Sequence, residues 1–302
     1  MSALALVQPD LLSRCLESAL TGLSPESCRV YKARILTWRD WHTQNQTPIA
    51  LNRENVNRYL KNLELTGSSA QVRNQTLAAL KRLASEASDL GWMDPRQAAK
   101  VQKLKSRRIS GVRTGRWLTL AQSASLMRFP DRTTRRGKRD GGVLALLLGC
   151  GLRRAEACAL ATAQIEWHGE TMLIRNIKGK GGRIRSVSVP AWAQSLIQDW
   201  RKEVDSAQTD RLLRSIDRSG TIGPSLSPAA VRDIVRHYGA QLGPELANLN
   251  PHDLRRTHAR LARLGGAPLE TIQKTLGHAS VKTTEVYVNA CDNSNAGDFI
   301  AL

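Results

Sequence analysis

PHDLRRTHARLARLGG, residues 251–266, has the pattern of one complete helix. Proline suits the first position of a helix and glycine suits its end. The stretch therefore predicts a helix that opens near Pro251 and closes at Gly265 and Gly266. The apolar residues expected to face the core are Leu254, Leu261 and Leu264.

The next stretch, APLETIQKTLGHA (267–279), predicts a second helix that begins at Pro268 and ends at Gly277. Its expected buried stripe consists of Leu269, Ile272 and Leu276. His278 then follows the helix end, where a side chain can point into a cleft. VKTTEVYV (281–288) is a further short apolar-periodic segment, and it carries Tyr287.

Four polar side chains in this region belong to one kind of chemistry. His252 and Arg255 are three residues apart, so a helix projects both from the same face. With His278 they supply donors for phosphate oxygens, and Tyr287 supplies a nucleophile for a phosphodiester. The pattern predicts breakage and rejoining of DNA strands.

The string HDLRRTHARLARLGGAPLETIQKTLGHASVKTTEVYV (252–288) resembles the C-terminal signature of the tyrosine recombinases, which include phage integrases and Xer-type resolvases. GCGLRRAEACAL (149–160) is similar to the family's Gly-Leu-Arg-x-x-Glu segment. That match implies a catalytic arginine at Arg153 with Glu156 as its acidic companion. KGKGGRIRSVSVP (178–190) resembles the family's catalytic hairpin and implies a catalytic lysine at Lys180.

The implied catalytic set has a physical basis for each role. Its members are Arg153, Lys180, His252, Arg255, His278 and Tyr287, supported by Glu156. The arginines can give forked, permanently charged hydrogen bonds to the phosphate, and a histidine adds a further donor. A free phenol has a pKa near ~10, so the tyrosine needs a proton acceptor, for which His252 is the natural candidate. Lys180 is placed to protonate the departing 5′ oxygen.

Short runs rich in branched residues, MLIRNI (172–177) and RIRSVSV (183–189), flank the glycine-containing turn and predict a β-hairpin. Elsewhere the patterns are helical, so we expect a mainly α-helical fold with a small β-hairpin or sheet. Residues 1–106 resemble the family's N-terminal SAM-like, helical core-binding domain, with helix starts at Ser24-Pro25, at Asn52 and at Ser68 or Ser69. Residues 107–116 are expected to form a basic linker, and residues 117–302 the catalytic domain and its tail.

The basic stretch RQAAKVQKLKSRRISGVRTGR (96–116) contains no acidic residue. A charge run is most often a solvated surface, but between two DNA-binding halves it can follow the DNA backbone. The residues assigned to DNA binding are Lys103, Lys105, Arg107, Arg108, Arg113 and Arg116.

Composition agrees with a polyanionic partner, because the 302-residue chain has a formal net charge of +19. It lacks an apolar run of about 18 residues and a cleavable signal, which predicts no membrane span. Five cysteines without framework spacing favour a reducing cytoplasm, where the protein would associate with the nucleoid. The sequence has no metal-ligand motif and no nucleotide-binding loop, so no metal, cofactor or ATP is expected.

The resemblance implies a site-specific recombinase that forms a 3′-phosphotyrosyl link and a Holliday junction, in integration, excision or resolution. Its partner is double-stranded DNA with paired recombination sites, bound by a homotetramer. The apolar tail residues Phe299, Ile300 and Leu302 are expected to dock on a neighbouring protomer. Two alternatives stay open: a type IB topoisomerase-like enzyme and a non-catalytic DNA-binding protein of the same fold.

Other residues favour a structural interpretation or depart from the family pattern. His42, His237, His258, Tyr59 and Tyr238 are interpreted as structural side chains. Ala155 stands where the family often has serine, and Arg256 where it often has histidine; neither is an implied catalytic position. We expect residues 1–22 to be too short for an additional arm-site DNA-binding domain, which favours a simple, Xer-like recombinase.

Overall fold

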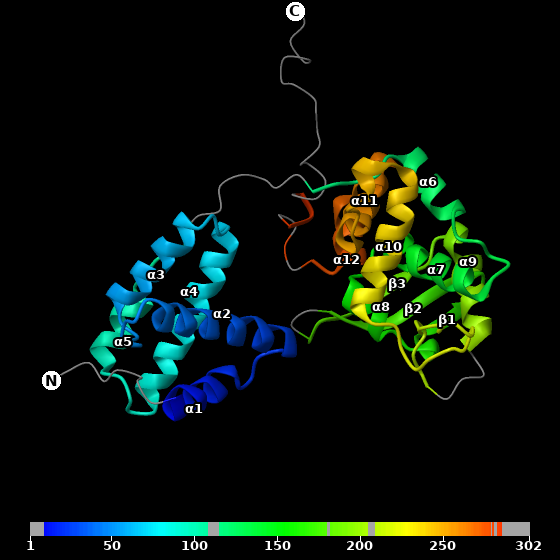
Figure 1. The fold of residues 1–302 in the computed structure, drawn as a ribbon. Helices are drawn as coiled ribbons and strands as arrows, with labels where there is room; N and C mark the ends of the chain where they lie inside the picture. The colour runs from blue at the N-terminus through cyan, green and yellow to red at the C-terminus, as the bar shows by residue number, and fades with distance from the viewer. Residues whose placement is uncertain are drawn as a thin grey trace, which may run out of the picture. The chain divides into compact units, whose positions relative to one another are not determined.

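The computed structural model describes residues 9–107, 115–179, 182–204, 209–278, 280 and 283–285. The chain divides into two compact units, Met1–Gly111 and Val112–Leu302, each with its own core (Figure 1). In the described part of the chain, none of the helices is both long and apolar enough to cross a bilayer.

The described residues of the first unit form helices joined by turns and loops, with no strand among them. Its helices are α1 (Pro9–Leu20), α2 (Pro25–Gln44), α3 (Arg53–Leu65), α4 (Ala70–Asp89) and α5 (Pro95–Gln102). α4 is the central helix, because α1, α2, α3 and α5 all pack against it. The core around it includes Trp38, Tyr59, Leu80 and Leu83, all 2 % exposed or less.

Local capping explains where these helices begin. Ser24 caps α2 with Pro25 at its first position, as the sequence predicts. Asn52 caps α3, and of the two candidate serines Ser69 caps α4. In each case the side-chain oxygen accepts a hydrogen bond from a backbone N–H that has no partner within the helix.

The second unit combines helices with one small sheet. Before the sheet come α6 (Leu120–Arg128), α7 (Arg135–Leu144), the π-helical turn η1 (Ala145–Gly149), α8 (Arg154–Ala159) and the 3₁₀ turn η2 (Thr162–Gln164). The strands are β1 (Ile165–His168), β2 (Thr171–Lys178) and β3 (Ile184–Ser188). After the sheet come α9 (Ala191–Val204), α10 (Pro228–Leu242), the 3₁₀ turn η4 (Pro244–Leu246), α11 (Pro251–Leu264) and α12 (Leu269–Leu276).

The sheet is antiparallel in the order β1-β2-β3. The hairpin β2–β3 agrees with the sequence pattern, with Leu173 opposite Ser188 and Lys178 opposite Ile184. Its register shifts between Ile174 and Ile177, where Asn176 has a positive φ of 55°. β1 is an additional strand that the sequence reading did not predict. The fold is therefore mainly α-helical with a small three-stranded sheet.

The apolar run VLALLLGC (143–150) forms the centre of this unit and is buried throughout. It covers the end of α7 and all of η1, and α9 and α11 pack against η1. The prediction for α11 is right at Leu254, which is fully buried, and wrong at Leu264, which is 72 % exposed. Leu264 lies in the last turn, beyond the part of the helix that the core covers.

Candidate active site

The start of α11 fixes the first two candidate residues. Asn250 caps the helix by accepting from the His252 N–H at 3.0 Å, and Pro251 occupies the first position. Asp253 completes a capping box by accepting from the Asn250 N–H at 3.2 Å. The cap holds the first turn, so that His252 and Arg255 keep a defined position in the second unit.

Arg255 is fully buried, and its guanidinium group joins three elements. Nη1 donates to the Gly151 carbonyl at 2.5 Å, and Nη2 donates to the Leu276 carbonyl at the end of α12. Gly151 has a φ of +60°, and a Cβ there would lie 2.9 Å from the His258 ring and from Leu276. Glycine is thus required where the chain leaves η1 for α8.

Glu156 on α8 binds two arginines at once. It accepts from the Arg153 backbone N–H at 2.8 Å and from Arg153 Nη1 at 2.7 Å. Its two oxygens also accept from Arg185 Nη1 and Nη2, at 3.0 and 2.8 Å. Burial alone would raise the pKa of Glu156, but the hydrogen bonds from Arg185 and Arg153 outweigh it and lower that pKa to about 2. The carboxylate is therefore ionised at neutral pH.

Arg185 is a site residue that the sequence reading did not single out. Besides Glu156, it binds the Thr275 carbonyl through Nε at 2.8 Å, which joins β3 to the end of α12. The alternation of side chains along a strand could have indicated this residue. Arg185 is two positions from the buried Val187, so both side chains lie on the same face of β3. Ile184, the apolar neighbour, is 62 % exposed instead.

His252 reaches the surface at the start of α11, beside the arginines. The protein around its ring removes water, and Arg256, Arg255 and Arg153 add positive charge, so its pKa is lowered to about 4. Its imidazole is therefore neutral at physiological pH. A neutral ring can accept a proton, as the proposed general base must.

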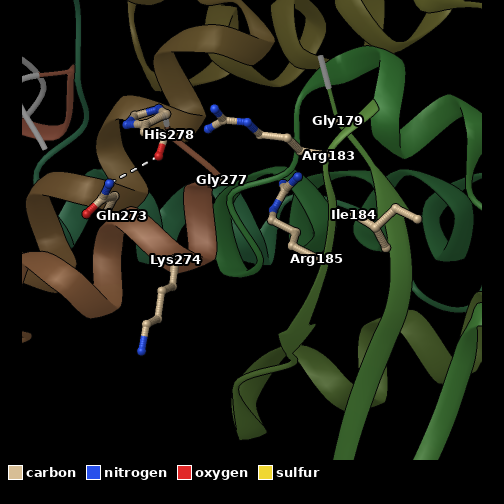
Figure 2. A pocket seen from close by; sticks show the side chains of 8 residues that line it. All are labelled: Gly179, Arg183, Ile184, Arg185, Gln273, Lys274, Gly277 and His278. Atoms are coloured by element: carbon tan, nitrogen blue, oxygen red, sulfur yellow. Dashed lines mark hydrogen bonds between the residues drawn. The ribbon is translucent and has the colours of Figure 1, made fainter. Parts of the chain in front are cut away.

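His278 follows the left-handed Gly277 (φ 61°) that ends α12. Gln273 makes two hydrogen bonds to the backbone of His278. The His278 N–H donates to the Gln273 carbonyl at 3.2 Å. Gln273 Nε2 donates to the His278 carbonyl, also at 3.2 Å (Figure 2). The ring Nδ1 is hydrogen-bonded to Thr284 Oγ1 at 3.0 Å. Burial and the nearby Arg255 and Arg153 lower the pKa of His278 to about 4.

A pocket of about 340 Å³ lies beside His278, between the hairpin β2–β3 and the end of α12 (Figure 2). It is lined by Gly179, Arg183, Ile184, Arg185, Gln273, Lys274, Gly277 and His278. The Gly179 N–H donates to the Arg183 carbonyl at 2.7 Å and closes the base of the hairpin. Lys180 follows Gly179 directly in the sequence.

Five of the candidate residues are thus gathered in one region: Arg153, Glu156, His252, Arg255 and His278. Lys180 and Tyr287 lie outside the described residues, as do Arg108 and Arg113. The remaining basic candidates, Lys103, Lys105, Arg107 and Arg116, are exposed. Arg107 is tied to the first unit, where its backbone binds Asn74 on both sides and its guanidinium binds Glu64.

Of the residues interpreted as structural, four are buried or partly buried and His237 is exposed. His42 is fully buried, with Nδ1 hydrogen-bonded to Thr47 Oγ1 at 2.8 Å. His258 donates to the Leu148 carbonyl at 2.9 Å, and Tyr238 donates to Asp140 at 3.1 Å. Tyr59 is 2 % exposed, whereas His237 is a surface residue that contacts Gln241.

At this site the second unit brings guanidinium groups and neutral imidazoles together around the ionised carboxylate of Glu156. The arginines Arg153, Arg185 and Arg255 outnumber Glu156, which leaves this cluster positively charged. Such an arrangement defines a site for an anion with several oxygens, of which a phosphodiester is one. The profile of the phage integrase family matches residues 116–294, more than half of the chain. The chain belongs to the phage integrase family.

Named relatives agree with this assignment. The protein called tyrosine recombinase XerC of Rhizobium meliloti (strain 1021) is 38 % identical over 152 residues, which are 49 % of this chain and 45 % of the relative. The tyrosine recombinase XerA of Pyrococcus horikoshii is 29 % identical over 149 residues, 49 % of this chain and 50 % of the relative. The chain spans about half the length of these curated relatives.

Solved structures share the fold along nearly the whole chain. The XerH site-specific recombinase bound to a palindromic difH substrate superposes with a TM-score of 0.71 at 20 % identity, covering 93 % of this chain and 81 % of XerH. The Tn1549 transposon integrase in complex with transposon right end DNA superposes with a TM-score of 0.66 at 13 % identity, covering 94 % of this chain and 95 % of the integrase. At these identities the likeness concerns the fold.

Proposed function

We propose that this protein is a site-specific DNA recombinase that cleaves and rejoins DNA through a tyrosyl phosphate. The observation that carries the proposal is the grouping of Arg153 and Arg255 with the neutral His252 and His278. Attack on a phosphodiester builds negative charge on its non-bridging oxygens, and fixed donors aimed at that charge are the main source of catalysis. The relatives named as tyrosine recombinases support the same chemistry.

In the proposed step, the phenol oxygen of Tyr287 attacks phosphorus and its proton passes to His252. The bond from phosphorus to the 5′ oxygen breaks, and that oxygen takes a proton from Lys180. The products are a 3′-phosphotyrosyl link and a free 5′ hydroxyl. Resealing reverses both transfers, so the bond energy is kept in the covalent link, and a second exchange resolves a Holliday junction.

The partner in this proposal is double-stranded DNA. Solved structures of the same fold are complexes with DNA, among them the XerH and Tn1549 proteins. The net charge of +19 favours the same ligand. The residues proposed to contact the backbone are the exposed Lys103, Lys105, Arg107 and Arg116, together with Arg108 and Arg113, which lie outside the described residues.

Trapping the covalent link is the decisive test. The protein is incubated with a library of nicked duplexes that carry a randomised stretch, so that cleavage releases a short strand and leaves the adduct. We expect a denaturant-resistant protein–DNA adduct whose DNA defines the target site. Tyr287→Phe keeps the ring without its oxygen, and we expect it to bind the recovered site and form no adduct. An adduct on Tyr287→Phe would assign another nucleophile.

The two alternative functions predict other outcomes. A type IB topoisomerase-like enzyme would relax a supercoiled plasmid and give no recombinant product from two recovered sites. A non-catalytic DNA-binding protein would give specific binding with no adduct at all. Recombinant product from paired sites, dependent on Tyr287, supports the recombinase.

We also propose that the protein assembles as a tetramer on two sites, linked by its C-terminal tail. The second unit carries an apolar groove of about 500 Å³ formed by α6, α11 and the start of α9. Leu120, which is 72 % exposed, and Trp192, which is 50 % exposed, lie on it. The proposed occupant is the apolar end of a second copy, Phe299, Ile300 and Leu302. Burying such side chains gives about 1.5 to 3 kcal/mol each.

A truncated chain and a groove variant test this link together. We expect a chain that ends at Ala296, and the full chain with Trp192→Ala, to bind one site normally but to lose cooperative pairing of sites. Trp167, which is 48 % exposed on β1, provides the matched control Trp167→Ala. Full cooperativity in the truncated chain would exclude the tail as a subunit link.

A further inference from the structure

The ring of His278 has a specific partner that the sequence motif does not include. Nδ1 lies 3.0 Å from Thr284 Oγ1, and the two residues are 8 % and 0 % exposed. The backbone of His278 is already fixed by Gln273 and by the turn at Gly277 (Figure 2). The bond to Thr284 is therefore not needed to place the backbone, and its effect falls on the ring.

That effect concerns which ring nitrogen carries the proton. A neutral imidazole has one N–H and one lone pair, and the hydrogen bond at one nitrogen selects the role of the other. Threonine can donate or accept, but its own hydroxyl proton needs an acceptor when it is buried. Among the described residues, His278 Nδ1 is the acceptor that the structure places beside Thr284 Oγ1. The Thr284 hydroxyl can donate a hydrogen bond to Nδ1 only if Nδ1 carries the lone pair of the ring and not its proton.

We propose that Thr284 is a positioning residue whose hydroxyl donates to His278 Nδ1, so that Nε2 carries the ring proton and donates it to a non-bridging oxygen of the phosphodiester. This inference rests on the proposed function and adds a residue to its site. The opposite tautomer would turn a lone pair toward the phosphate, which repels negative charge. One hydroxyl thus decides whether His278 stabilises the transition state or opposes it.

The nucleophile and this hydroxyl belong to one short segment, because Thr284 precedes Tyr287 by three residues. Thr283 provides a matched control, since it is exposed and adjacent. Thr284→Val keeps the branched shape and removes the hydroxyl, whereas Thr284→Ser keeps the hydroxyl. Comparing the two separates the hydrogen bond from packing.

The first measurement is independent of activity. Full-length protein with ¹⁵N-labelled histidine is studied by long-range ¹H–¹⁵N spectra at neutral pH, and His278 is assigned with His278→Gln among the six histidines. We expect the wild type, Thr284→Ser and Thr283→Val to hold the Nε2–H tautomer. Thr284→Val should show exchange between tautomers. A wild-type ring protonated at Nδ1, or an unchanged tautomer in Thr284→Val, would overturn the proposal.

The second measurement is the rate of adduct formation on a saturating nicked duplex. We expect Thr284→Val to cleave about 10- to 100-fold more slowly, with unchanged affinity, because the site loses part of one oriented donor. Thr284→Ser should cleave near the wild-type rate, as should Thr283→Val. Equal rates for Thr284→Val and wild type would exclude the role. If the wild-type protein forms no adduct, the proposed function fails, while the tautomer measurement still decides on Thr284.

Discussion

At the scale of single residues, Glu156 determines how the arginines are held. It is 7 % exposed and binds both Arg153 and Arg185, which holds the two guanidinium groups beside the same carboxylate. The two arginines expected to stabilise the phosphate differ in their surroundings. Arg255 is buried and binds two backbone carbonyls, whereas the Arg153 side chain is 32 % exposed. Removal of Arg255 would therefore disturb the fold as well as the chemistry.

Arg153 gives the cleaner test of transition-state stabilisation. We expect Arg153→Ala to lower the rate of adduct formation by about 10² to 10³, as for loss of one oriented donor, with little change in affinity. Glu156 keeps Arg185 as a partner, so the variant should stay folded. Single-turnover kinetics and a binding isotherm measure the two effects. The exposed neighbour variant Arg154→Ala is the control, and equal losses of rate and affinity would mark Arg153 as a binding contact only.

Arg256 should control the protonation of His252. The partial loss of water around the His252 ring is the largest cause of its low pKa, and Arg256 is the next, ahead of Arg255 and Arg153. We expect Arg256→Gln to raise that pKa from about 4 towards its ordinary value of 6.5. Asp253, whose carboxylate lies 3.6 Å from Arg256, would raise the pKa of His252 as well, because its negative charge would no longer be offset by that arginine.

The low pKa of His252 also makes the stability of the fold depend on pH. Between pH 6.5 and about 4 the unfolded chain binds more protons at this position than the folded chain, so acidification destabilises the fold there. Arg256→Gln should reduce the loss of stability on acidification. An NMR titration of the His252 ring measures the pKa directly, with Arg263→Gln in the last turn of α11 as the control. An unchanged His252 titration would contradict the assignment.

At the scale of elements, Arg185 joins three parts of the unit that are distant in sequence. It lies on β3, binds Glu156 on α8, and binds the carbonyl of Thr275 in α12. Gly277 must lie close to it, because a Cβ at that glycine would be 2.9 Å from Arg185 Cδ. The hairpin and the loop with His278 are therefore held in one arrangement.

A double-mutant cycle measures this connection. We expect Arg185→Gln to lower the free energy of unfolding by about 3 kcal/mol, because a buried carboxylate loses a partner. In the Glu156→Gln background the same change should cost at least about 1 kcal/mol less, since the two residues interact directly. Urea unfolding gives the values, and the exposed Arg183→Gln should stay within about 0.5 kcal/mol of wild type. Additive effects would show that the pair does not interact.

At the scale of the whole molecule, the two units have cores that share no residue. The first unit closes its core with α5, through Val101, and with Leu104 just beyond it. A chain of about 110 residues is long enough for an independent core. The division between the units falls at Gly111 and Val112.

We therefore expect a fragment of residues 1–111 to fold alone and unfold in one cooperative transition. The buried Trp38 provides a fluorescence signal in addition to helical circular dichroism. A fragment of residues 1–94 lacks α5 and should be much less stable, because it exposes the side of α4 against which α5 packs. A non-cooperative transition for residues 1–111 would mean that this unit depends on the rest of the chain.

Local patterns predicted much of this architecture because they act over a few residues. The caps at Ser24 and Asn52 and the proline at Pro251 lie beside the helices that they start, and the turn at Gly277 lies beside the helix that it ends. The same logic failed at Leu264, where the helical pattern continues into solvent, and at β1, whose four residues carry too short a pattern.

The sequence by itself determined the helical framework and the hairpin, and its local motifs predicted Arg153, Glu156, His252, Arg255 and His278 as candidate site residues. Tertiary structure alone decided how they are held. Arg185 reaches Glu156 across 29 residues, and Arg255 reaches the Gly151 carbonyl across 104. Such bonds depend on how separate elements pack, and each arginine has many carbonyls and carboxylates that it can bind. Only packing brings one acceptor within reach and removes the competing water.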